Sequence, residues 1–105
     1  ARTASVELAG GGVATAHWAP SVGRAVVVTD GLSALPTDKS FELWFVRGDA
    51  PISAGTFEVG ADGSATALLQ GDMQAGDVIA VTVEPAGGSP NGLPSTDPIV
   101  VIPTA

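Results

Sequence analysis

Apolar residues in this chain recur at every second position, and this alternation limits its fold more than any other feature. In residues 40–46 (SFELWFV), Phe41, Leu43 and Phe45 share one face, while Trp44 lies on the other. A period of two residues is that of a β-strand, and no window carries the 3.6-residue apolar stripe of an amphipathic helix over three turns. The alternation predicts about eight short strands, in residues 5–9, 13–19, 23–30, 40–46, 55–59, 64–70, 77–84 and 98–103.

Turn-forming residues separate these segments at short intervals and so predict the fold class. Such spacing is typical of an all-β, antiparallel β-sandwich of the immunoglobulin-like kind. The glycines 10–12 predict a tight turn after the first strand, and Asp62-Gly63 predicts a hairpin because both residues tolerate positive φ. The β-branched run in residues 23–30 (GRAVVVTD) indicates a strand buried on both faces. Residues 70–77 (QGDMQAGD) have room for one helical turn, but their glycines disfavour more.

The length and composition indicate a single domain, spanning residues 1–105. A chain of 105 residues with 45% hydrophobic residues can bury a core without help from a metal or a disulfide. It has no cysteine, which excludes thiolate metal sites and a cysteine nucleophile. Its formal net charge of −7 argues against nucleic acid or an anionic membrane surface as a partner, because both reward clustered Lys and Arg.

Few residues of this chain are of the types that act in catalysis or bind metals. His17 is the only histidine, so neither a multi-histidine metal centre nor a Ser-His-Asp triad is expected, and a structural role is favoured. Aromatic residues make up 5% of the chain, too few to line a sugar groove, so Glu42 and Glu84 are not interpreted as a glycosidase pair. The loop aspartates lack the spacing of a calcium loop. We therefore expect no enzyme, no catalytic or metal-binding residue and no cofactor.

Residues 82–90 (TVEPAGGSP) lead into the longest irregular segment of the chain, residues 85–98. Pro85 has no N–H for a strand ladder, so pairing should stop near it. Gly87 and Gly88 allow backbone conformations that other residues avoid. The sequence therefore predicts that a strand ends here and that an irregular loop follows.

Glu84 comes at the end of that strand. Its carboxylate is able to accept hydrogen bonds from N–H groups of the loop, or to pair with an arginine such as Arg24 or Arg47. We favour a structural staple that holds the loop over a contact to a ligand, and both partner types stay open at this point.

Three segments stand in order along most of the chain. They are residues 30–46 (DGLSALPTDKSFELWFV), 51–69 (PISAGTFEVGADGSATALL) and 80–101 (AVTVEPAGGSPNGLPSTDPIVV). Together they resemble the C-terminal, extracytoplasmic domain of the anti-sigma-K factor family of bacterial membrane proteins. The sequence departs from the family pattern at Phe41, where Tyr is common, after Gly31-Leu32, and in a longer link after the GGS. These departures affect loop details and not the expected fold.

The residues that match the motifs of this family are interpreted as structural markers, since the family supplies no catalytic residues. They are Gly31, Leu32, Trp44, Gly55, Phe57, Glu84, Pro85, Gly87 and Gly88.

The resemblance implies a role in regulation. In the family, an N-terminal cytosolic domain binds an extracytoplasmic-function sigma factor, and one transmembrane helix connects it to the outer domain. A site-1-type protease or a signal partner outside the membrane starts a stepwise proteolysis, first outside the membrane and then within it by an intramembrane protease, that frees the sigma factor. This chain would be the sensory or protease-protecting part of a membrane-anchored protein, on the extracytoplasmic side of the bacterial cytoplasmic membrane.

Two further expectations concern the surroundings of this domain. The chain shows no apolar run long enough to span a membrane, no signal peptide and no initial Met, so we expect a domain cut from a longer protein, without the sigma-binding domain and the helix. The residues alone leave open a second class of function, an exported ligand- or protein-binding module on the cell surface.

Overall fold

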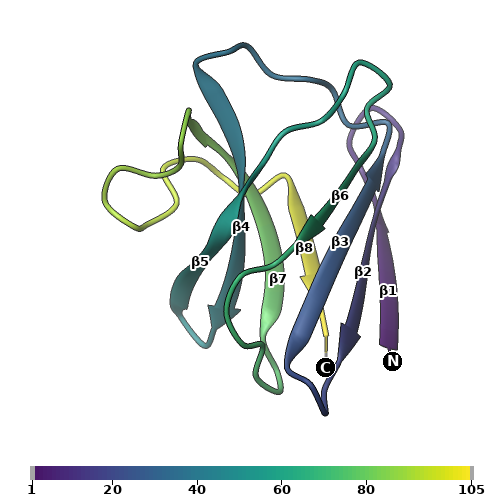
Figure 1. Ribbon diagram of the computed structural model, residues 1–105, viewed down its shortest axis with the longest axis vertical. Helices are drawn as coiled ribbons and strands as arrows, with labels where there is room; N and C mark the ends of the chain where they lie inside the picture. Colours follow the sequence, from purple (N-terminus) through teal and green to yellow (C-terminus); the bar gives the residue numbers. More distant parts are fainter. Residues whose placement is uncertain (1, 105) are drawn as a thin grey trace.

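The structure, a computed structural model, describes residues 2–104, and in them eight β-strands form two sheets of four. The sheets lie face to face as two layers (Figure 1). No helix that could cross a membrane is found in this part of the chain. These findings confirm the predicted all-β, antiparallel sandwich, and the immunoglobulin-like topology stays a prediction.

All neighbouring strands that pair within the two sheets run antiparallel. Sheet A has the order β1-β2-β3-β6 and consists of Arg2–Glu7, Val13–Ala19, Arg24–Asp30 and Ala65–Leu68. Sheet B has the order β5-β4-β7-β8 and consists of Ala50–Phe57, Lys39–Arg47, Val78–Pro85 and Val100–Pro103.

The core lies between the two sheets and follows the alternation of the sequence. On β4, Phe41, Leu43 and Phe45 point into it, and Phe41 stacks on Phe57 with ring centroids 5.2 Å apart. Burying one such side chain contributes roughly 1.5–3 kcal/mol. The other core members are Leu8, Ala14, Ala16, Trp18, Ala25, Val27, Leu32, Ala54, Ala67, Leu69, Ile79, Val81, Val100 and Ile102.

Some strand limits and one burial prediction are wrong. β1 begins at Arg2 rather than at residue 5, and β5 begins at Ala50 rather than at residue 55. β3 is buried on one face only, because Val28 is 36% exposed. A sandwich of two layers leaves every strand with one outward face, so a β-branched run does not by itself indicate burial on both sides.

The tight turn predicted at residues 10–12 is confirmed, and the hairpin predicted at Asp62-Gly63 is wrong. Residues 10–12 turn tightly between β1 and β2, where the Leu8 N–H donates to the carbonyl of Gly12 at 2.9 Å. Asp62-Gly63 also forms a turn, and Gly63 has φ +77°. However, β5 before it and β6 after it belong to different sheets, so the connection is a crossover and not a hairpin. Residues 70–77 turn without any helix.

Candidate functional site

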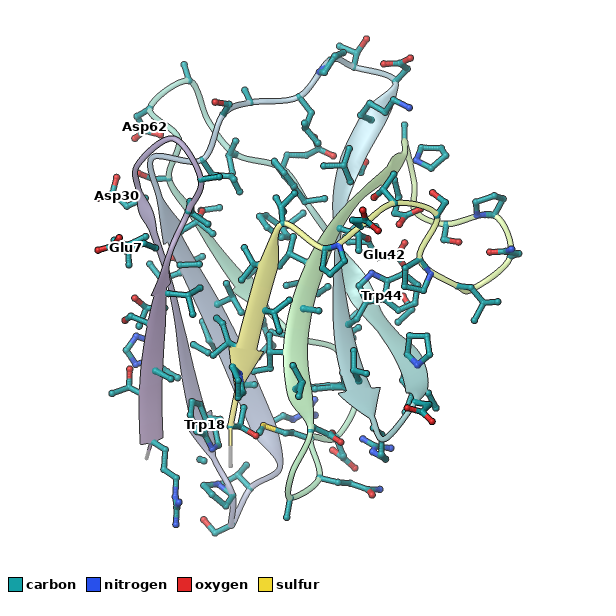
Figure 2. The ribbon with its side chains drawn as sticks, turned by 180° about the vertical axis from the view of Figure 1, so that it is seen from behind. Glu7, Trp18, Asp30, Glu42, Trp44 and Asp62 are labelled. Carbon is teal, nitrogen blue, oxygen red and sulfur yellow. The ribbon has the colours of Figure 1, made fainter. Side chains whose placement is uncertain are left out.

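Along the two central strands of sheet B, β4 and β7, the outward face is polar and yet buried, whereas Val101 on the edge strand β8 is 46% exposed. Glu42 and Trp44 of β4 point away from the core, as do Thr82 and Glu84 of the neighbouring strand β7. Trp44 is 0% exposed although it does not belong to the core between the sheets. The loop of residues 86–98, which joins β7 to β8, lies over this face, and Figure 2 shows Glu42 and Trp44 beside it. We call residues 86–98 the clamped loop.

Glu42 holds the first half of the clamped loop. One of its carboxylate oxygens accepts the N–H of Ser89 at 2.6 Å, and the other accepts the hydroxyl of Ser53 on β5. A carboxylate that accepts backbone N–H groups makes hydrogen bonds roughly twice as strong as neutral ones. The loop that covers this buried carboxylate therefore satisfies one of its oxygens, and β5 satisfies the other.

A bulge in β5 brings Ser53 to Glu42. Glu42 pairs with Thr56 and Trp44 pairs with Ser53, so the register shifts between them. Gly55 lies in the shifted stretch with φ +103°, a conformation that favours glycine. The bulge thus explains why a glycine occupies position 55, one of the family markers.

Glu84 holds the second half of the clamped loop. It accepts the N–H of Ser95 at 3.0 Å as well as the Ser95 hydroxyl, and it accepts the Thr82 hydroxyl at 2.7 Å. The Thr82 oxygen in turn accepts the indole N–H of Trp44 at 2.9 Å. The predicted bond from a loop N–H to Glu84 is therefore confirmed. The alternative partner Arg47 is wrong, since it pairs with Asp77 instead.

Glu84 stays ionised in this buried position. Burial by itself raises the pKa of its carboxyl group, but the hydrogen bonds from Ser95 and Thr82 and the charge of Lys39 outweigh that effect and lower the pKa below its ordinary value. The charged form is the one that accepts these hydrogen bonds. The folded loop and the ionised carboxylate therefore stabilise each other.

The tip of the clamped loop is held by its own hydrogen bonds. The Ser89 hydroxyl donates to the side-chain oxygen of Asn91 at 2.9 Å and to the carbonyl of Leu93, and the Leu93 N–H donates to Asn91 at 3.1 Å. This tip curls away from sheet B (Figure 1), and Leu93 is 51% exposed. The segment between the two anchors is thus ordered locally rather than by packing.

A third buried carboxylate, Asp77, holds the opposite end of sheet B. Arg47 donates from Nε and Nη2 to the two oxygens of Asp77 at 2.9 and 2.7 Å, and the Gln74 N–H donates to Asp77 at 2.9 Å. The hydrogen bond from Arg47 chiefly lowers the pKa of Asp77, although burial opposes it. Sequence reasoning missed this pair, whose members lie 30 positions apart.

Asp77 and Glu84, two of the three buried carboxylates, make the stability of the domain depend on pH. The pKa of each is lower in the folded chain than its ordinary value, which is 3.8 for Asp77 and 4.5 for Glu84. Their contribution is therefore complete above these values and is lost as the pH falls through the lower, folded values. We expect the free energy of unfolding to stay level down to about pH 5 and then to fall. Denaturant titrations between pH 7 and pH 3 check this, and a Glu84→Gln, Asp77→Asn double variant should lose much of the slope.

The family markers fall into three places in the structure. Trp44, Gly55, Glu84, Pro85, Gly87 and Gly88 gather at the clamped loop and beneath it. Gly31 and Leu32 lie where β3 leaves sheet A, and there the Leu32 N–H donates to the carbonyl of Gly63 at 3.1 Å. Phe57 stacks on Phe41 in the core. Each marker thus has a local structural role, and the marker assignment itself stays a prediction.

The glycines that open the clamped loop differ in the space around them. Gly87 and Gly88 have φ +89° and +108°. A Cβ added to Gly88 would lie 3.2 Å from the Glu42 carboxylate and 3.3 Å from Thr56, whereas one added to Gly87 would meet nothing within 4 Å. We expect Gly87→Ala to cost about 1 kcal/mol of stability and Gly88→Ala about 2 kcal/mol or more, because only the second also displaces Glu42. Chemical denaturation of the two variants checks this order, and equal costs would contradict it.

Among the described residues, no cluster of potential metal ligands lies at the clamped loop. Within residues 2–104 no three side chains of His, Asp or Glu come together as metal ligands. His17 is exposed on the outer face of sheet A, in agreement with a structural interpretation. Two open hollows of about 320 and 520 Å³ lie at opposite ends of the sandwich, and most of the side chains that line the larger are apolar. The fold and the site define a small all-β domain whose special feature is a covered sheet face.

Comparison with known proteins identifies the family. Residues 1–99 match the family described as anti-sigma-K factor rskA, C-terminal, and the chain belongs to this family. It is 37% identical to a Streptomyces griseus protein named "Uncharacterized protein in phr 5'region", covering 100% of this chain and 44% of that protein. It is 33% identical to the anti-sigma-K factor RskA of Mycolicibacterium vanbaalenii, covering 84% of this chain and 37% of that protein. No solved structure matches.

These findings confirm the family resemblance and fix its extent. A further relative, the anti-sigma-K factor RskA of Mycobacterium sp. (strain KMS), is 32% identical over 84% of this chain and 36% of its own length. The chain thus spans less than half the length of the curated relatives it matches.

Proposed function

We propose that this chain is the extracytoplasmic regulatory domain of a membrane-bound anti-sigma factor, which controls an extracytoplasmic-function sigma factor through regulated proteolysis. Family membership and the names of two relatives support the anti-sigma role. The parent protein would cross the cytoplasmic membrane once. Its partners would be the sigma factor on the inner side and a site-1-type protease or a signal partner on the outer side.

One observation carries the proposed mechanism, the clamping of residues 86–98 by two buried carboxylates. Proteases bind an extended stretch of backbone, and a folded sandwich offers such a stretch mainly in its long irregular loop. Here Glu42 and Glu84 hold the two halves of that loop. The free energy needed to open the loop and the strands beneath it would then set the rate of the first cleavage.

The domain would act without catalysis. Its regulatory output would be a change in its own local stability, caused by a signal or a partner, and this role requires no cofactor. A drop of 1.4 kcal/mol in the opening free energy raises the open population about tenfold. A small structural change at the clamped loop is therefore enough to alter the rate of cleavage.

The coding sequence upstream of Ala1 tests this proposal. We expect one apolar run of about 20 residues, preceded by a soluble domain of about 100 residues. That upstream domain, produced alone, should capture a sigma factor from a lysate of the same organism. A cleavable signal peptide joined directly to Ala1 would contradict the proposal and would favour an exported binding module on the cell surface.

A further inference from the structure

The outer face of sheet A has no cover within the described residues, unlike the outer face of sheet B. Two rows of its side chains cross all four strands. One row contains Thr3, His17, Val26 and Leu68, and the next contains Ser5, Thr15, Val28 and Thr66. Three of its apolar side chains are strongly exposed: Leu68 at 59%, Val13 at 40% and Val28 at 36%. These exposed apolar side chains stand among Thr, Ser and His side chains on one uncovered face, which makes the face a candidate interaction surface.

The outward residues of β3 show which partner fits this face. Along the strand they are Arg24, Val26, Val28 and Asp30. The order along the strand is positive, apolar, apolar, negative. When a second copy of the strand runs in the opposite direction, each charged residue meets one of opposite charge and each valine meets a valine. The two charged residues lie six positions apart, about 20 Å, and neither takes part in the ion pair between Arg47 and Asp77.

We propose that two copies of this domain associate through the outer faces of sheet A, with their strands antiparallel. A two-fold axis in the plane of contact, perpendicular to the strands and level with Val27, would relate the copies. This axis places Arg24 of each copy opposite Asp30 of the other, and it places Val26 of each copy opposite Val28 of the other. An isologous contact of this kind repeats each pair twice. The reverse alignment, with parallel strands, would set like charges against each other.

The neighbouring strands are compatible with the same axis. Thr15 lies beside Val28, and His17 lies beside Val26, so Thr15 of one copy would face His17 of the other. By the same geometry, Leu68 would face Thr66 across β6. Glu7 lies in the same cross-strand row as Val13 and Asp30, at one end of the face. The titratable groups of this face are therefore Glu7, His17, Arg24 and Asp30.

The size of the face predicts weak association. Four strands about 4.8 Å apart and about 23 Å long cover roughly 440 Å² per copy, so the dimer would bury roughly 900 Å² in total. This area is at the lower limit for specific interfaces. The net charge of −7 on each copy opposes association further. We therefore expect a dissociation constant of about micromolar to millimolar rather than nanomolar.

Sedimentation equilibrium of the chain at physiological ionic strength tests the proposal. At protein concentrations up to about 1 mM, which span the expected dissociation constants, the average mass should rise from 10.3 kDa toward twice that value. Arg24→Asp or Asp30→Arg alone should weaken self-association at least about tenfold, because each sets like charges opposite each other twice. An equimolar mixture of the two variants should associate again, since both positions then pair opposite charges, one pair with the original sign and one with the reversed sign. A chain that stays monomeric at all concentrations, or single variants that associate as well as the parent, would overturn the proposal.

A pair of apolar substitutions locates the contact. Leu68→Ser removes an exposed side chain from the proposed face, and Leu93→Ser removes one of similar exposure from the tip of the clamped loop. The first should weaken association severalfold and the second should leave it unchanged, while both variants should keep the stability of the parent because neither residue is buried. Loss of association with Leu93→Ser and not with Leu68→Ser would place the contact elsewhere and overturn the proposal.

Discussion

Replacing Trp44 with alanine is expected to lower the free energy of unfolding by about 3–5 kcal/mol. The indole is fully buried between sheet B and the clamped loop, and its N–H donates to Thr82, the residue that donates in turn to Glu84. The substitution leaves a cavity under the loop and removes the first donor of this chain of hydrogen bonds. Urea denaturation followed by circular dichroism measures the loss.

Two control variants separate these contributions. Trp44→Phe keeps most of the buried ring but removes the N–H donor, and it should cost clearly less than the alanine variant, about 1–2 kcal/mol. His17→Ala changes an exposed ring on the other sheet and should stay within about 0.5 kcal/mol of the parent. A Trp44→Ala variant as stable as His17→Ala would contradict the placement of Trp44 beneath the loop.

Replacing Glu84 with glutamine is expected to cost about 1–3 kcal/mol and to loosen residues 95–98. Glutamine has nearly the same shape, but its NH₂ group cannot accept the hydrogen bonds that Thr82 and Ser95 donate to the two carboxylate oxygens. The amide proton of Ser95 should exchange with solvent at least about tenfold faster, since a loss of 1.4 kcal/mol in protection corresponds to that factor. Hydrogen exchange measured by NMR gives this rate directly.

A matched substitution tests whether burial is the cause. Glu58 is also a carboxylate that accepts one serine hydroxyl, from Ser40 at 2.9 Å, but it is exposed. Ser40 contacts the clamped loop at its start, where the Gly87 N–H donates to it at 3.3 Å, and not at Ser95. Glu58→Gln should leave the exchange of Ser95 unchanged and cost less than about 0.5 kcal/mol. If Glu84→Gln changes neither the melting temperature nor the exchange of the loop, Glu84 is not the staple described here.

The strands and the core were predictable because they follow from a local period. Side chains two positions apart must share a face, so the inward set Phe41, Leu43 and Phe45 could be assigned from seven consecutive residues. Strand partners were not predictable in the same way. Asp62-Gly63 correctly indicated a turn, but whether the next strand pairs with the last or crosses to the other sheet depends on the whole chain.

The site was predictable only in outline. The sequence placed Glu42 and Trp44 on the strand face opposite Phe41 and suggested Glu84 as a staple. Its interpretation of Trp44 as a core residue is wrong, because the indole is buried on the outward face of sheet B and not between the sheets. The sequence did not indicate Ser89 and Ser95 as the donors, because the path of an irregular Pro- and Gly-rich loop has no periodicity to read. The Arg47–Asp77 pair was missed for a related reason, since no local pattern joins residues on separate strands.

The free energy needed to open the clamped loop links the stability of this loop to the proposed function. Trp44→Ala, Glu84→Gln and Glu58→Gln are expected to lower it by decreasing amounts. In the full-length parent protein, this series should therefore change the first cleavage in the same order. The cytosolic part that would hold the sigma factor is identical in all of these variants, so any change in output must come from the outer domain.

The most direct test is a reporter of sigma-factor activity in cells that produce the full-length parent protein, measured together with its first cleavage product. We predict that basal reporter output and cleavage both rise in the order Glu58→Gln, Glu84→Gln, Trp44→Ala. The rise in output should disappear in cells that lack the intramembrane protease. If Trp44→Ala and Glu84→Gln destabilise the purified domain but leave cleavage and reporter output at the level of the parent, the clamped loop does not control release of the sigma factor.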